Sequence, residues 1–175
     1  MPDSDEKLEF GCIFCRTGSE LHVAEDIENS HPGICAFAPR RLRKRHMVCG
    51  NLQEAVILFP GYIFIAAPAD YPAARLMENR HCYRLLHAEG GGWQLRGADR
   101  DLARMMHENH GIVGISQAYY EGGRIRIADG FLRGREGEII RVNRRAQTAQ
   151  VRLRILDRTL LAWVGFELLG NMDGR

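Results

Sequence analysis

The stretch Gln150-Val151-Arg152-Leu153-Arg154-Ile155 alternates polar and apolar residues without interruption. Side chains on a β-strand point in turn to the two faces of a sheet, so this pattern predicts a strand with one buried face and one face in water. A helix would instead repeat its apolar residues every three or four positions. The stretch therefore identifies the last third of the chain as β-structure.

Short strands are expected on both sides of this stretch, separated by turn signals. The strands are Arg124–Ile127, Glu138–Asn143 and Thr159–Val164, and the turns are Asp129-Gly130, Arg144-Arg145 and Leu156-Asp157-Arg158. Several short strands with regular turns in about 55 residues predict a small barrel. We expect this domain to cover residues 119–172, after a linker at 111–118 that carries no strong pattern.

The preceding part of the chain, residues 8–110, mixes strand and helix patterns, so the predicted fold class is α+β. Thr17 and Glu20 form a capping-box pattern ahead of a helix that should stop before His31-Pro32-Gly33. Further helices are expected from Asp70 to Asn79 and from Asp99 to Asn109. Strands are expected at Phe10–Arg16, Ile34–Pro39, Val56–Ala67 and Tyr83–Ala88.

Two stretches of this first part favour a role in binding. The basic run Arg40–His46 lies between two strands and predicts a hairpin loop, either solvated or touching DNA or a partner protein. Phe59-Pro60-Gly61-Tyr62-Ile63-Phe64 predicts a bulged or edge strand, because proline cannot donate to a central ladder. A bulge would turn these aromatic side chains out of the sheet as interface anchors, whereas a regular strand would leave them in the core.

Nothing in the sequence indicates an enzyme, a metal site or a cofactor. Cys12 and Cys15 have zinc-like spacing, but on a strand they point to opposite faces and no second pair follows them. Five scattered cysteines also argue against a disulfide framework. With no secretory signal at Met1–Glu9 and no apolar run of about 20 residues, we expect a cytoplasmic protein that does not enter membranes.

The charge is unevenly distributed along the chain. Residues 119–175 contain eleven arginines, no lysine and seven acidic residues, although the whole chain has a net charge of only +2. Arginine presents a planar fork of donors that suits phosphates and base edges. Residues 119–175 therefore either contact nucleic acid or simply form a basic, solvated surface.

Two motifs resemble those of the NusG family of transcription factors. Cys15-Arg16-Thr17-Gly18-Ser19-Glu20 together with Leu58–Phe64 looks like the NusG N-terminal (NGN) domain. The stretch Gly123–Val142 is similar to the KOW motif, centred on Gly137. The resemblance covers nearly the whole chain and implies an NGN domain with a mainly antiparallel four-stranded sheet, followed by a five-stranded SH3-like KOW barrel.

This resemblance implies a non-enzymatic elongation factor that acts as a monomer on RNA polymerase. The NGN domain of the family grips the clamp helices of the polymerase β′ subunit through a hydrophobic depression and suppresses pausing or termination. The positions that match its motif are Phe14, Phe59, Pro60, Tyr62 and Phe64. Arg16 is expected to face the non-template DNA strand, since the family uses that surface.

The second domain is most similar to that of LoaP, a specialised NusG paralog. Where a housekeeping KOW carries an aromatic residue before the motif glycine, this chain has Arg133-Gly134-Arg135-Glu136. The resemblance implies antitermination at specific operons and a KOW domain that binds an RNA hairpin in the nascent leader transcript. The expected RNA contacts are Arg141, Arg144, Arg145, Arg152 and Arg154.

Two alternatives remain open. The chain could be a general housekeeping factor that couples polymerase to Rho or the ribosome. It could also be an RNA- or ribosome-binding KOW protein that never acts on polymerase.

Overall fold

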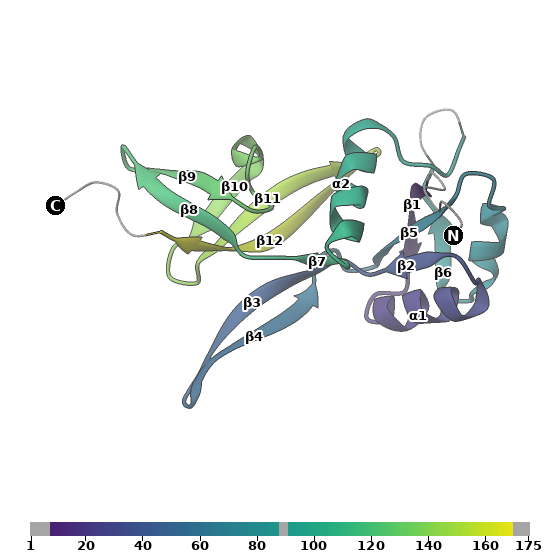
Figure 1. The fold of residues 1–175 in the computed structure, drawn as a ribbon, viewed down its shortest axis with the longest axis horizontal. Coiled ribbons are helices and arrows are strands. Elements are labelled where there is room, and N and C mark those ends of the chain that lie inside the picture. The colour runs from purple at the N-terminus through teal and green to yellow at the C-terminus, as the bar shows by residue number, and fades with distance from the viewer. Residues whose placement is uncertain (1–7, 88–90, 170–175) are drawn as a thin grey trace, which may run out of the picture. The chain divides into compact units, whose positions relative to one another are not determined.

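The computed structural model describes residues 8–87 and 91–169 of the 175-residue chain. Strands predominate and helices are few, so the fold is α+β, as the sequence predicts. Figure 1 shows the helices and strands of the chain. Contacts between residues divide the chain into two units. Unit 1 comprises the described parts of Met1–Pro39, Phe59–Gly111 and Ile155–Arg158, and unit 2 those of Arg40–Leu58, Ile112–Arg154 and Thr159–Arg175.

Unit 1 is built on a four-stranded antiparallel sheet in the order β2-β5-β1-β6. Helix α1 packs against β2 and β5, and helix α2 packs against β1. Its elements are β1 (Leu8–Cys15), α1 (Glu20–Ser30), β2 (Cys35–Phe37), β5 (Tyr62–Pro68), the 3-10 helix η1 (Ala73–Glu78), β6 (Cys82–Leu85) and α2 (Gly97–Glu108).

Helix α1 forms where its spacing predicts, but its start differs from the expected capping box. Val23, Ala24 and Ile27 are buried along one face, and the helix ends where the N–H of His31 donates to the carbonyl of Ile27. Ser19 occupies the N-cap position, and Thr17 lies outside the helix. The carboxylate of Glu20 instead accepts from backbone N–H groups outside the helix, so it serves the neighbouring loop rather than a reciprocal cap.

Two further expectations for unit 1 are wrong. The helix expected from Asp70 to Asn79 is the shorter 3-10 helix η1, whose first turn closes from Arg75 N–H to Pro72 C=O at 3.0 Å. The stretch around Pro60 is neither a bulged nor an edge strand, because β5 begins only at Tyr62 and pairs with both β1 and β2. Proline lies in the turn before that strand, where its missing N–H removes no ladder hydrogen bond.

The basic run Arg40–His46 is a strand and not the hairpin loop predicted from its charge. In unit 2, β3 (Arg40–Met47) pairs with β4 (Gly50–Ile57), and a two-residue turn joins them. Arg40 lies opposite Ile57 at one end of the pairing, and Met47 lies opposite Gly50 at the other. A third short strand, β7 (Ile112–Val113), runs parallel to β3. Backbone pairing on both sides therefore decides the structure of this run despite its poor apolar pattern.

The rest of unit 2 is a five-stranded sheet in the order β10-β11-β12-β8-β9. Its strands are β8 (Ser116–Glu121), β9 (Arg124–Asp129), β10 (Ile139–Asn143), β11 (Thr148–Ile155) and β12 (Arg158–Leu168), with a 3-10 turn η2 (Glu136–Glu138) before β10. The turn Ile155–Arg158 belongs to unit 1 by its contacts. The four strands predicted here are confirmed, and β8 is the one that the sequence pattern missed.

The expected domain limits, 8–110 and 119–172, stay predictions, and residues 88–90 and 170–172 lie outside the described part. The division by contacts falls between Gly111 and Ile112 and groups Arg40–Leu58 with the second unit. The expected linker at 111–118 is not irregular, since it holds β7 and the start of β8. Among the described helices, none is long and apolar enough to cross a membrane.

Candidate nucleic-acid interface

Strand β11 presents arginine on one face only. Val151, Leu153 and Ile155 are at most 1% exposed, whereas the alternating Arg152 and Arg154 are exposed. This is the arrangement that the alternation predicts. The outward face of β11 therefore carries two cations about 7 Å apart, two strand residues along.

Strand β10 and the turn that follows it add the other three predicted RNA contacts. Arg141 lies on β10, and Arg144 and Arg145 lie in the turn between β10 and β11, all of them exposed. The Asn143 side-chain oxygen accepts from the Ala146 N–H at 2.9 Å and closes this turn. The structure thus brings all five predicted arginines onto one hairpin.

None of these five arginines has a carboxylate partner among the described residues, in contrast to Arg126 and Arg135 of the same unit. Arg126 pairs with Glu121 at 2.9 Å and Arg135 with Glu138 at 3.5 Å. In the hairpin, Arg144 instead lies over the ring of Tyr120, with its guanidinium carbon 4.9 Å from the ring centre. The charge of the hairpin is therefore available to an external anion.

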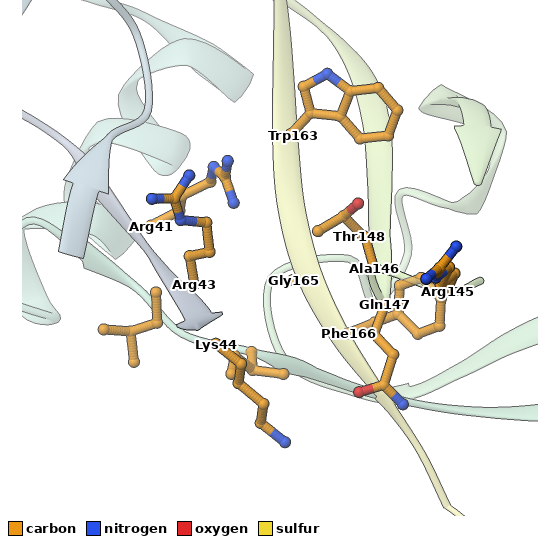
Figure 2. Close-up of a pocket in the computed structure, with 12 residues that line it drawn as sticks. Arg41, Arg43, Lys44, Arg145, Ala146, Gln147, Thr148, Trp163, Gly165 and Phe166 are labelled. Carbon is orange, nitrogen blue, oxygen red and sulfur yellow. The ribbon is translucent and has the colours of Figure 1, made fainter. Parts of the chain in front are cut away.

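A pocket of about 320 Å³ opens in unit 2 between β3, the β10–β11 turn and β12. Figure 2 shows Arg41 and Arg43 on one side of it and Trp163 with Thr148 on the other. Strand β3 lies close to β12 at Gly165, where an added Cβ would be 3.2 Å from the carbonyl oxygen of Leu42. The lining residues are Arg41, Leu42, Arg43, Lys44, Ile115, Arg145, Ala146, Gln147, Thr148, Trp163, Gly165 and Phe166.

The cations around this pocket are not equivalent. Arg43 pairs with Glu54, and Lys44 pairs with Glu167 at 2.8 Å. The Nη1 of Arg41 is buried without a hydrogen-bond partner. Burial, and then the charge of Arg43, lowers the pKa of Arg41 below its ordinary value. The pocket therefore holds one desolvated cation that its surroundings do not compensate.

Trp163, which no sequence motif singles out, is half-buried and lines the pocket. Its neighbours on β12, Ala162 and Val164, are almost fully buried. A tryptophan at the outward position of an alternating strand is a signal that the sequence does contain. A role for Trp163 in binding depends on the residues of β3, which only the fold brings to the same pocket.

The predicted polymerase patch is only partly at the surface. Phe59 and Phe64 are at most 1% exposed, and their ring centres lie 6.4 Å apart in the core. Tyr62 is 8% exposed. The expectation that these side chains turn out of the sheet is therefore wrong, because β5 is a central strand covered on both faces.

An aromatic cluster nevertheless reaches the surface beside this strand. Phe14 is half-buried and contacts Tyr62 and Tyr83, with ring centres 5.3 and 6.1 Å away. Tyr83 is 57% exposed and Pro60 is exposed as well. Phe14 and Pro60 thus remain available for contact, and Tyr83 is a residue that the motif did not include.

A buried carboxylate fixes the loop beside this cluster. Glu20 is 3% exposed and accepts from the Gly61 N–H at 2.7 Å and the Gly18 N–H at 2.9 Å. Gly61 has a φ of +82°, and a Cβ there would lie 2.9 Å from the Phe14 ring. Glycine therefore allows Phe14 to lie over the loop, and Glu20 holds that loop in place.

The cysteines do not form a metal site in the described residues, which hold no group of three or more metal-ligating side chains. Cys12 and Cys15 are fully buried. Burial is the main cause that raises the pKa of Cys15 to about 12 and those of Cys35 and Cys82 to about 11. Burial raises the pKa of Cys12 as well.

We expect only Cys49 to react quickly with iodoacetamide in the native protein. It is exposed in the β3–β4 turn. A raised pKa leaves little thiolate at pH 8, and thiolate is the reactive form, so the other four thiols should react slowly until the pH nears their pKa. Mass spectrometry should find one label in native protein, none in Cys49→Ser, and five in denaturant. Rapid labelling of Cys12 or Cys15 would contradict the burial of β1.

Arg16 is exposed at the end of β1, where its N–H donates to the carbonyl of His81 at 3.0 Å. Its contact with DNA stays a prediction. No protein-family model matches the sequence, and a search of curated proteins gave no match.

Proposed function

We propose that the chain is a transcription elongation and antitermination factor of the NusG type. It binds RNA polymerase through unit 1 and a hairpin of the nascent leader transcript through unit 2. The observation that carries the proposal is the β10–β11 hairpin, which displays five arginines without carboxylate partners among the described residues. A surface of this kind attracts phosphates, and it suits recognition of an RNA helix by its shape.

The architecture supports the same proposal. A four-stranded antiparallel sheet with helices is followed by a five-stranded sheet, in the order that an NGN domain and a KOW domain would have. The half-buried Phe14, together with the exposed Tyr83 and Pro60, provides an apolar surface for polymerase. By binding the elongating conformation of polymerase better than the paused one, the protein would shift polymerase toward elongation.

A second candidate is an RNA-binding protein that does not act on polymerase. The burial of Phe59, Tyr62 and Phe64 favours this candidate, because three of the five side chains expected to contact polymerase are packed in the core. We prefer the first candidate because Phe14 and Tyr83 still form an exposed aromatic surface next to them.

A termination assay with purified polymerase distinguishes these functions. On a template with a leader hairpin upstream of a terminator, the full chain should raise readthrough several-fold, and it should have little effect without the hairpin. Tyr83→Glu should abolish the gain, since a charge in an aromatic contact must be desolvated without a partner. Because Tyr83 is exposed, the variant should fold normally.

The matched control is Leu21→Glu, which makes a similar change at a 51% exposed apolar residue on α1. Readthrough should survive in this variant. Hairpin-independent readthrough would indicate the general housekeeping function instead. If the chain changes readthrough on neither template but still binds the hairpin, the second candidate is correct.

A further inference from the structure

We propose that the pocket between β3, the β10–β11 turn and β12 binds one unpaired nucleotide, with its phosphate held by Arg41 and Arg145 and its base stacked on Trp163. The inference rests on the proposed function in one respect, since the RNA bound by unit 2 supplies the nucleotide. It goes beyond recognition of helix shape, because it gives the protein a means of selecting RNAs that have a bulged or looped-out base.

The charge of the pocket indicates an anionic ligand. Four of its lining residues are cationic and none is acidic. Glu54 and Glu167 already compensate Arg43 and Lys44. Arg41 and Arg145 have no carboxylate partner among the described residues, so they carry the uncompensated charge of the lining.

Arg41 is the lining residue whose charge and hydrogen-bond donors are least satisfied within the protein. Its buried Nη1 has no hydrogen-bond partner, and buried donors in proteins are almost always satisfied. A phosphate bound at the accessible part of this half-buried guanidinium would add a charge-assisted hydrogen bond and would offset the burial that lowers its pKa. Arginine stays protonated at neutral pH even so, which leaves the pocket cationic.

The opposite wall suits a planar base. Trp163 is half-buried and lines the pocket. The amide of Gln147 and the hydroxyl of Thr148 line the same space and offer donors and acceptors to a base edge. The volume of about 320 Å³ falls within the range of small-ligand sites.

Two observations favour a nucleotide of RNA over an acidic peptide. An acidic peptide would use the cations but would leave the indole without a planar partner, whereas a base stacks on it. The outward face of β11 also continues from Thr148 at the pocket to Arg152 and Arg154. Those arginines can bind the phosphates that flank the unpaired nucleotide.

Fluorescence of Trp163 tests the pocket directly. The chain has two tryptophans, and Trp93→Phe leaves Trp163 as the single reporter. Adenosine monophosphate should quench this signal at lower concentration than ribose 5-phosphate, which lacks the base. Arg41→Gln and Arg145→Gln should each weaken the response, and Arg104→Gln, an exposed arginine on α2 outside the pocket, should leave it unchanged.

The second measurement uses the full chain and two RNA hairpins, one fully paired and one with a single bulged adenosine. Wild-type protein should bind the bulged hairpin about ten- to a hundredfold more tightly, as expected for one stacked base. Trp163→Leu and Arg41→Gln should remove this difference and leave the affinity for the paired hairpin nearly unchanged. Circular dichroism of each variant checks that it is folded.

The outcomes separate the pocket from the proposed function. Equal affinity for both hairpins, without quenching of Trp163, would overturn the nucleotide pocket and leave RNA binding by the arginines intact. Quenching by adenosine monophosphate without binding to either hairpin would support the pocket as a nucleotide site and contradict the proposed function. If polyglutamate displaces adenosine monophosphate at equal concentration, the pocket recognises an acidic peptide and the proposal is wrong.

Discussion

The double variant Arg144→Glu/Arg145→Glu should lose at least about a hundredfold in affinity for the leader hairpin at low salt. Each reversal removes a phosphate contact and replaces it with a repulsive charge at the turn where both arginines are exposed. Since neither arginine pairs with a described carboxylate, the reversal breaks no ion pair in the protein. The stability of the fold should change little, apart from the loss of the Arg144 contact with Tyr120.

Salt dependence gives this prediction a second readout. The logarithm of the binding constant should fall less steeply with the logarithm of salt concentration in the double variant, by about two units of slope for two lost phosphate contacts. The measurement is fluorescence anisotropy of a labelled hairpin over a range of salt. It should be made at the same pH and temperature for all variants.

The matched control reverses two other exposed arginines of unit 2, Arg124→Glu/Arg133→Glu. This variant has the same net charge as the first, so it separates position from total charge. It should retain most of the affinity. An equal loss in both variants would mean that the overall charge of the unit attracts RNA and that the β10–β11 hairpin has no special part.

The largest loss of stability is expected from Gly130→Ala. Gly130 has a φ of +92°, and a Cβ there would lie 2.7 Å from the Cα of Ser116. Because the obstacle is backbone, it cannot move aside as the end of a side chain could. We expect a cost of about 3–5 kcal/mol from the left-handed conformation and the overlap together.

The position of Ser116 explains why this clash should also disturb the neighbouring residues of unit 2. Ser116 is fully buried at the start of β8, and its Oγ accepts from the N–H of the buried Leu132 at 3.1 Å. Moving Ser116 away from Gly130 would break this hydrogen bond and disturb the register of β8 with β9. A loss of this size is comparable with the whole stability of a small domain, so RNA binding should be lost with it.

Gly134→Ala is the natural comparison, because Gly134 has a φ of +75° but no atom within 4 Å of an added Cβ. It should cost only about 1 kcal/mol, from the backbone conformation alone. Urea unfolding followed by circular dichroism measures both variants. Equal losses at the two glycines would show that backbone conformation decides the cost and that the contact with Ser116 does not.

The two proposals use different chemistry on neighbouring parts of unit 2. The exposed arginines of the β10–β11 turn and of β11 would recognise phosphates without regard to sequence. The pocket would add a stacked base and so a preference among RNAs. Reversal of Arg144 and Arg145 should therefore weaken binding to both hairpins, and to the bulged one more strongly because Arg145 also lines the pocket, whereas Trp163→Leu should affect only the bulged one. The comparison separates the general affinity for phosphates from the selectivity that Trp163 provides.

The sequence by itself determined the elements whose pattern is local. The alternation of Gln150–Ile155 predicted both the strand β11 and the outward face of Arg152 and Arg154. The helical spacing of Leu21, Ala24 and Ile27 likewise predicts helix α1, in which Ala24 and Ile27 are buried. These predictions hold because the side-chain period of a strand or helix is a property of a few consecutive residues.

Only the tertiary structure decided the features that depend on distant partners. Phe59 and Phe64 are core because β5 lies between β1 and β2. The basic run at Arg40 is a strand because β4 and β7 pair with it. Arg41 and Trp163 line one pocket although 121 positions separate them in the chain. Strand pairing brings together residues that are far apart in the sequence, and a local periodicity contains no information about such pairs. These parts of the candidate site could therefore not be predicted from the pattern of the sequence.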